Sequence, residues 1–210
     1  AAITELATGA PGYSSVLPNS MSPLAMTLKL NGYCTAQFGK CHEVPVWQAS
    51  PVGPFDAWPT GGGGFEYFYG FIGGEANQWY PTLYEGTTPV ENKKTPEQGY
   101  HFMEDMATKA IKWIGQQKSL APEKPFFMYF ALNTPHYPYQ GYAKWLKHYK
   151  DLPYPRNLYA AFLSTQDEAI GQLIGTVDRL GLRKNTIIIF QSDHGHSHEE
   201  RAHFGGGSSG

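Results

Sequence analysis

The chain has 210 residues, a formal net charge of −2 and 41% hydrophobic residues, enough apolar material for one large domain with a real core. With a net charge this close to zero, no overall field favours nucleic acid or a membrane surface, and neither is expected as a partner. No stretch approaches the roughly 20 apolar residues that cross a bilayer. The opening residues, AAITELATGAPGY, also lack the features of a signal peptide, and the compartment stays open.

The first predicted unit is a helix followed by a strand. Ser22–Leu30 has Pro23 where a helical first turn accepts it, and Asn31-Gly32 suits the C-terminal cap. The short run Tyr33–Phe38 is expected to be a strand.

The two cysteines of the chain flank this strand. If the segment between Cys34 and Cys41 is extended, they lie roughly 20 Å apart, which is too far for a disulfide. We therefore expect no disulfide framework.

Two more helix–strand units follow. Apolar residues at helical spacing predict a helix around Met103–Ile114, and the apolar run Pro125–Leu132 predicts a buried strand. The same spacing predicts a helix over Leu158–Leu180, which Gly181 ends, and then a strand at Thr186–Phe190. Strands that are apolar throughout are typical of a parallel sheet covered by helices on both faces.

Between the first two units lies a Gly-, Pro- and aromatic-rich stretch, residues 43–97. It includes Gly61–Gly64 and Phe65–Phe71 (FEYFYGF). This stretch is too aromatic for a linker, so we expect an ordered loop excursion that covers another part of the domain. The Gly/Ser-rich tail, residues 205–210, resembles an engineered linker, although natural glycine loops exist.

Chemically useful side chains come at or just past each predicted strand. Lys40 and His42 follow the first strand, His136 follows the second, and Asp193 and His194 follow the third. In an open α/β sheet, ligands bind outside the carboxyl ends of the strands. A tetrahedral anion needs cations or donors for its oxygens, a proton donor for the leaving group and hard ligands for a metal. We therefore expect these residues to meet at one edge of one sheet.

Each residue alone has an ordinary interpretation. A lysine after a strand is usually solvated, a loop histidine is usually satisfied locally, and Asp-His-Gly can be a turn. The run of histidines at positions 194, 196, 198 and 203, with Glu199 and Glu200 between them, also allows a zinc-binding tract. His101 and His148 are expected to face solvent.

Four segments carry a family resemblance. GYCTAQFGKCHE resembles the GY-x-T-x-x-x-GKWH segment of type I sulfatases, with Cys41 where many members have Trp. TPHYP resembles the Pro-His-x-Pro loop of that family, and IIIFQSDHG resembles its metal loop. FDAWPTGGGGFEYFYGFIGGEANQWYP is similar to the corresponding segment of bacterial arylsulfatases. The resemblance covers nearly the whole chain, and it implies that residues 1–210 form part of one catalytic domain.

The resemblance implies an alkaline-phosphatase-like α/β sandwich that hydrolyses sulfate esters through a formylglycine hydrate beside a calcium ion. It implies that Lys40 contacts the sulfate oxygens and that His42 assists the hydrate. His136 would be the general acid or a sulfate donor, and Asp193 and His194 would ligate Ca²⁺. His194 is the less usual ligand, since Ca²⁺ prefers oxygen. The substrate would be a small-molecule sulfate ester, and the aromatic residues of Trp58–Tyr80 suggest an aryl group unless they only pack within their own domain.

The departures from the family pattern are also informative. No Cys/Ser-x-Pro-x-Arg motif, the source of formylglycine, occurs in the sequence, so the catalytic domain is expected to be partial and the isolated chain inactive. Two alternatives stay open. One is a phosphate or phosphonate ester hydrolase of the same superfamily, and the other is a non-catalytic, zinc-binding domain. The oligomeric state is not indicated by the sequence.

Overall fold

The computed structural model describes residues 17–18, 20–48 and 55–192. By their internal contacts they form two compact units. The first holds the described residues up to 74, with 81–93 and 116–131. The second holds residues 75–80 and 94–115, with the described residues from 132 onward.

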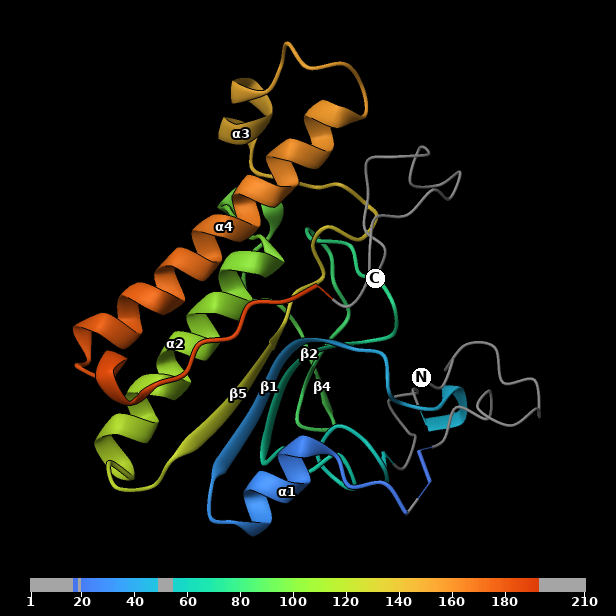
Figure 1. Ribbon diagram of the computed structural model, residues 1–210. Helices are drawn as coiled ribbons and strands as arrows, with labels where there is room; N and C mark the ends of the chain where they lie inside the picture. Colours follow the sequence, from blue (N-terminus) through green and yellow to red (C-terminus); the bar gives the residue numbers. More distant parts are fainter. Residues whose placement is uncertain (1–16, 19, 49–54, 193–210) are drawn as a thin grey trace. The chain divides into compact units, whose positions relative to one another are not determined.

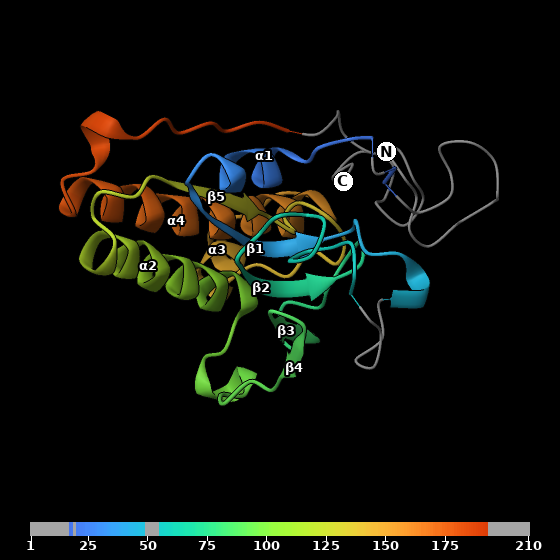
Figure 2. The same ribbon diagram turned by 90° about the horizontal axis from the view of Figure 1, so that it is seen from below.

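The first unit contains a mixed five-stranded sheet (Figure 1). Its strand order is β4-β3-β2-β1-β5. Strand β1 pairs in parallel with β2 on one side and β5 on the other, and their arrows point the same way in Figure 2. The β2–β3 and β3–β4 pairs are antiparallel. The strands are β1 (Cys34–Cys41), β2 (Tyr67–Ile72), β3 (Leu83–Glu85), β4 (Thr88–Val90) and β5 (Phe126–Ala131).

Two of these strands were predicted from the sequence and three were not. It predicted β1 and β5 from their apolar runs, although β1 continues to Cys41 rather than ending at Phe38. Strands β2, β3 and β4 all lie in residues 43–97, which we expected to be a loop excursion. The glycines and prolines around β2 are typical of a loop, although the strand itself is buried over most of its length.

Strands β1 and β2 approach closely at a pair of glycines. Gly39 and Gly70 are register partners, and a β-carbon on Gly70 would overlap the backbone carbonyl oxygen of Gly39. Gly39 itself has φ +99°, a conformation that side chains other than glycine rarely adopt. The local path of β1 just before Lys40 thus requires glycine at both positions.

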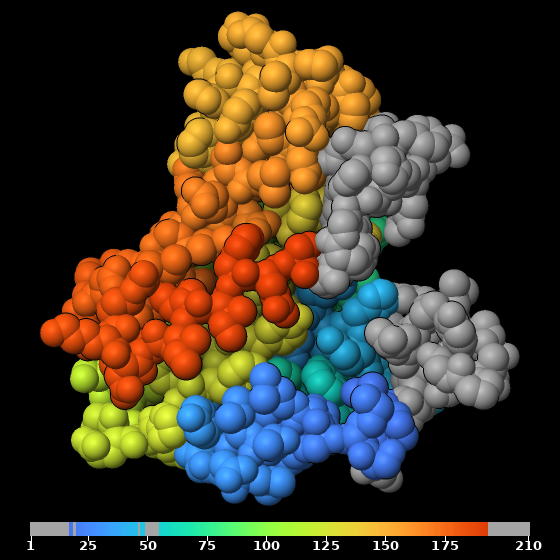
Figure 3. All heavy atoms as spheres, viewed as in Figure 1, coloured from blue at the N-terminus to red at the C-terminus, as the bar shows by residue number. Residues whose placement is uncertain are grey.

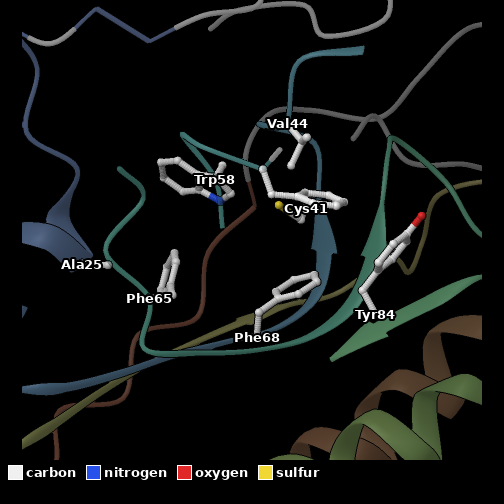
Figure 4. Packing of buried hydrophobic residues seen from close by; sticks show 8 residues of the cluster. Ala25, Cys41, Val44, Trp58, Phe65, Phe68 and Tyr84 are labelled. Carbon is white, nitrogen blue, oxygen red and sulfur yellow. The ribbon is translucent and has the colours of Figure 1, made fainter. Parts of the chain in front are cut away.

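Aromatic side chains from the glycine-rich stretch form much of the core of the first unit (Figure 4). Trp58 and Phe65 meet edge to face, with ring centroids 5.9 Å apart. Phe68 on β2 is fully buried in the same cluster, and burying a phenylalanine contributes about 1.5–3 kcal/mol. Part of the aromatic segment therefore packs within its own domain, as one interpretation of the sequence proposed.

Helix α1 (Leu24–Leu30) belongs to the same unit and matches the predicted first helix closely. Pro23 stands at its N-cap and Asn31 at its C-cap, and Gly32 follows with φ +89°. Only Ala25 of this helix is fully buried, and the segment lies at the surface in the space-filling view, in blue (Figure 3).

The helices of the second unit follow the predicted periodicity. Helix α2 (Phe102–Leu120) starts in this unit, and α4 (Arg156–Arg179) covers the predicted third helix, with Gly181 at φ +70° just past its end. Helix α3 (Ala143–His148) packs against α4. In the described part of the chain, no helix is both long and apolar enough to span a membrane. The short 3₁₀ helices are η1 (Val46–Gln48), η2 (Pro96–Gln98) and η3 (Arg183–Asn185).

The strand predicted at Thr186–Phe190 is wrong for this structure. The segment follows η3 without forming a strand, and it runs along the surface, in red in Figure 3. Ile187 is 89% exposed, and Ile189 and Phe190 are also largely exposed. The segment is apolar, as the prediction required. A strand also needs a neighbouring strand to pair its backbone groups, and none of the described strands pairs with this segment.

The glycine pair gives a stability prediction for the full-length protein. Gly70→Ala should lower the free energy of unfolding by roughly 3 kcal/mol, because the new methyl group meets a backbone atom that cannot rotate away. Urea denaturation monitored by tryptophan fluorescence measures the change. Gly171→Ala is the matched control. Gly171 lies in α4 with open space around its Cα, so alanine there should stabilise the protein by about 0.5–1 kcal/mol. Equal midpoints for Gly70→Ala and the wild type would contradict the close approach.

Candidate functional site

Lys40 is the seventh residue of β1, partly exposed near the carboxyl end of the strand. Its backbone is held by a buried side chain, since Gln37 Nε2 donates to the Lys40 carbonyl oxygen at 2.8 Å. The same amide accepts a hydrogen bond from Trp58 Nε1 at 3.1 Å. Gln37 thus connects the aromatic core to the end of β1 and fixes the backbone from which the Lys40 side chain extends.

His42 comes directly after β1 and lies beside the glycines that follow β2. A β-carbon on Gly74 would lie 2.9 Å from His42 Cε1, closer than real β-carbons approach other atoms. Gly73, just before it, donates from its backbone N–H to the Cys41 carbonyl oxygen at 2.9 Å. The two glycines therefore let the chain pass close to the imidazole and confine it on one side.

Cys41 and Glu43 flank His42. Cys41 is fully buried, whereas Glu43, like His42, is partly exposed. Burial raises the pKa of the Cys41 thiol well above its ordinary value, and the nearby Glu43 carboxylate raises it further. Burial also raises the pKa of Glu43, partly offset by hydrogen bonds and by His42. Cys41 therefore behaves as a buried apolar group of the core cluster rather than as a nucleophile.

A pocket of about 460 Å³ opens beside Glu43 in the first unit. One Glu43 oxygen, Oε2, is buried and finds no hydrogen-bond partner among the described residues. The rest of the pocket wall is mainly apolar, including Met21, Met26 and Trp58.

His136 lies in the loop that follows β5, within the second unit. Its backbone N–H closes a turn onto the Asn133 carbonyl oxygen at 2.8 Å. Its ring nitrogen Nδ1 is 3.1 Å from the Tyr137 carbonyl oxygen and 3.2 Å from Glu75 Oε2. Both partners are acceptors, so the hydrogen of the neutral ring is assigned to Nδ1.

The loop around His136 is anchored to α4 at its far end. Gly141 lies so close to the backbone of Ala161 that a β-carbon there would be 2.6 Å from the Ala161 carbonyl carbon. The Tyr142 N–H donates to Thr165 Oγ1 at 2.9 Å, within the same helix. A loop held in this way can present a histidine in one orientation.

His101 is not the solvent-facing residue that we expected. It is 2% exposed and precedes α2, where its Nδ1 accepts a hydrogen bond from the Met103 N–H at 3.2 Å. Its Nε2–H donates to the Gln140 carbonyl oxygen at 2.8 Å, and the rings of Trp79 and Tyr142 lie edge-on to it. The burial of His101 could not be predicted from the sequence, because a polar residue just before a helix is usually exposed. His148 is exposed, as predicted.

The predicted metal ligands Asp193 and His194 lie outside the described residues, and so do the histidine-rich tract and the tail at 205–210. Within 17–18, 20–48 and 55–192, no three His, Cys, Asp or Glu side chains are grouped as metal ligands. Both cysteines are free thiols, as expected.

Lys40 is the last but one residue of β1 and His42 directly follows the strand, so both residues lie at its carboxyl end. Strand β5 is a parallel neighbour of β1, with Gly39 opposite Ala131, so both strands end at the same edge of the sheet. His136 follows the last residue of β5 by five positions and belongs to the second unit. Sequence reasoning missed Gln37, Gly74 and Glu75, because their roles depend on contacts distant in sequence.

Known proteins resemble this chain along nearly its whole length. A family model described as Sulfatase matches residues 2–210. The chain belongs to the sulfatase family. Arylsulfatase J of Mus musculus is 30% identical to it over 197 residues, which cover 88% of this chain and 31% of that protein. The arylsulfatase of Klebsiella aerogenes is 24% identical over 244 residues, with coverages of 89% and 50%.

Solved structures agree on the fold. The crystal structure of Ps i-CgsB superposes with a TM-score of 0.65 at 21% identity, over 80% of this chain and 39% of that one. PsFucS1 sulfatase from Pseudoalteromonas sp. gives 0.55 at 18% identity, over 77% and 35%. These likenesses confirm the predicted α/β class and sulfatase-like architecture. The chain spans about a third to a half of the length of the sulfatases named above.

The buried histidine gives a pH prediction. Burial lowers the pKa of His101 from 6.5 to about 4. Between these values the unfolded chain binds a proton that the folded chain does not, so stability falls as the pH drops from 6.5 towards 4. The loss from this group is up to roughly 3 kcal/mol.

His101→Asn tests the assignment, because asparagine can keep the helix cap without titrating. Urea midpoints between pH 7.5 and 4.5 should fall less steeply with acid in the variant than in the wild type. Parallel pH curves for the two proteins would show that His101 is not the buried titrating group.

Proposed function

We propose that this chain supplies part of the active site of a sulfuric ester hydrolase that acts on small-molecule sulfate esters. The proposal rests mainly on the position of Lys40 and His42, which both lie at the carboxyl end of β1. The sulfatase family model matches the chain that contains them over residues 2–210. The edge formed by the carboxyl ends of parallel strands is where α/β proteins bind ligands.

Lys40 is proposed to bind the non-bridging oxygens of the sulfate group. An ammonium group held on a fixed backbone stabilises negative charge on those oxygens without reorganising during the reaction. Gln37 fixes that backbone through the Lys40 carbonyl oxygen. His42, confined by Gly74, is proposed to assist the nucleophile by holding or moving a proton at its ring nitrogens.

His136 is proposed to be the general acid that protonates the leaving oxygen. Its Nδ1 is occupied by two acceptors, which leaves Nε2 to deliver the proton. The other role that the family resemblance allows, a neutral donor to the sulfate oxygens, predicts a different dependence on the leaving group.

We propose calcium as the metal, with Asp193 and His194 among its ligands by their motif positions. In the complete enzyme, formylglycine would supply the nucleophilic oxygen, and calcium would hold charge on the sulfate. The 210 residues contain no Cys/Ser-x-Pro-x-Arg motif, so activity is to be sought in the full-length protein.

Two curated relatives carry the name arylsulfatase, and we propose an aryl sulfate as one accepted substrate. The proposal does not rest on the aromatic segment as a whole. Trp58, Phe65 and Phe68 are buried in the core cluster of their own unit, whereas Tyr80 is exposed. The phosphate-ester alternative gains no support, since the matched family model is Sulfatase.

A leaving-group series in the full-length protein tests these roles. His136→Ala should slow alkyl sulfates by about 10²–10⁴-fold and affect nitrophenyl sulfate far less, because a nitrophenolate hardly needs a proton when it departs. Lys40→Ala should slow both substrates alike, since the non-bridging oxygens are the same whatever departs. Rates are compared as kcat/KM.

Lys29→Ala is the control for loss of a lysine charge, because Lys29 lies in the last turn of α1 and has no assigned role. An equal loss on every substrate for His136→Ala would refute the acid role and favour a sulfate-binding donor. A wild-type protein inactive on all sulfate esters would refute the proposed function itself.

A further inference from the structure

Glu75 is a carboxylate that the proposed roles leave unused, and it contacts His136. Its Oε2 atom is 3.2 Å from His136 Nδ1, and both residues belong to the second unit. We propose that Glu75 is a positioning residue for His136, which fixes the ring orientation and keeps the proton on Nδ1. The inference rests on the proposed function and gives a role to Glu75, a residue of the family-like segment to which the resemblance assigned none.

The short segment that contains Glu75 is fastened to the loop that contains His136. Asn133 Nδ2 donates to the Ala76 carbonyl oxygen at 3.1 Å, next to Glu75. The Gln78 N–H donates to Gln140 Oε1 at 2.7 Å, beyond His136. Asn133 and Gln140 lie on either side of His136, whereas Ala76 and Gln78 both follow Glu75. The segment is therefore held against the loop just after Glu75, which places the Glu75 side chain beside His136.

The far end of the same segment is fixed as well. The Phe102 N–H donates to the Gln78 carbonyl oxygen at 2.8 Å, and His101 donates to the Gln140 carbonyl oxygen. Gln78 and His101 are both buried. The buried start of α2 thus anchors the segment and the loop together, and Glu75 stands at the exposed end of this assembly.

The exposure of the pair indicates what the contact does. The Glu75 side chain is 41% exposed and that of His136 is 13% exposed, so water screens their attraction and the pair adds little to stability. An acceptor on Nδ1 still fixes which ring nitrogen carries the proton, a role that carboxylates commonly take beside functional histidines. A carboxylate also stabilises the positive charge that the ring carries before it gives up a proton.

The proton balance of the step is simple. A nucleophilic oxygen, whose proton is proposed to pass to His42, bonds to sulfur. The bond between sulfur and the leaving oxygen breaks, and the electron pair of that bond goes to the leaving oxygen. The proton on His136 Nε2 moves to that oxygen. The ring becomes neutral with its remaining proton on Nδ1, against Glu75 and the Tyr137 carbonyl oxygen. Glu75 keeps its own ionisation state throughout.

Kinetics of the full-length protein provide the first test. Glu75→Ala should slow alkyl sulfates by about 10–100-fold, less than the loss of the acid itself, and nitrophenyl sulfate by less than about threefold. Glu75→Gln should recover part of the loss, because its amide oxygen still accepts a hydrogen bond. In a His136→Ala background, Glu75→Ala should cause no further loss, since the residue acts only through His136.

The second test does not need activity. ¹⁵N spectra of histidine side chains, with His136 assigned from a His136→Gln variant, should show the neutral ring protonated on Nδ1 in the wild type. In Glu75→Ala the Tyr137 carbonyl oxygen is the acceptor that remains for Nδ1, so a measurable share of the Nε2–H form should appear beside the Nδ1–H form. Glu168→Gln is the matched control, because it removes a carboxylate paired with Lys144 at 2.6 Å on the surface of the same unit.

Two results would overturn the inference. One is a wild-type ring protonated on Nε2, or a tautomer that Glu75→Ala leaves unchanged. The other is a loss in Glu75→Ala that is equal for all leaving groups and persists in the His136→Ala background. A protein inactive on sulfate esters would refute the proposed function, while the spectra would still decide the role of Glu75.

Discussion

At the Gly39–Gly70 pair, the carbonyl oxygen of one strand occupies the space where the other strand would carry a β-carbon. Much of the first unit depends on this close approach. It sets the spacing of β1 and β2, brings the end of β2 beside the end of β1, and places the glycines at 73 and 74 against His42. Gly39 directly precedes Lys40, so the backbone path at Gly39 sets the position of the Lys40 Cα atom. A site that binds a tetrahedral anion needs this precision, because donors misplaced by an ångström lose much of their effect.

Several parts of this arrangement could be predicted from the sequence, for physical reasons that are easy to name. Helices α2 and α4 are long enough for their 3.6-residue periodicity to be unambiguous, and β1 and β5 are apolar runs bounded by turn residues. Lys40, His42 and His136 were selected by short motifs whose spacing matches that of the sulfatase family.

Other parts could not be predicted, because they depend on contacts between distant residues. Strand β2 is surrounded by glycine and aromatic residues that indicate a loop, and only its pairing with β1 makes it a strand. Thr186–Phe190 shows the opposite error, an apolar run with no strand beside it among the described strands. His101 gave no sign of burial, because its partners Gln140 and Trp79 are far away in sequence. Gln37 and Glu75 escaped notice for the same reason.

We propose that Lys40 and His42 form the sulfate-binding end of β1, and a crystal structure of the full-length protein with bound sulfate would decide the matter. We expect a sulfate with one oxygen about 3 Å from Lys40 Nζ and another within hydrogen-bonding reach of the His42 ring. A fully occupied sulfate bound elsewhere, with the Lys40 side chain extended into solvent, would contradict it.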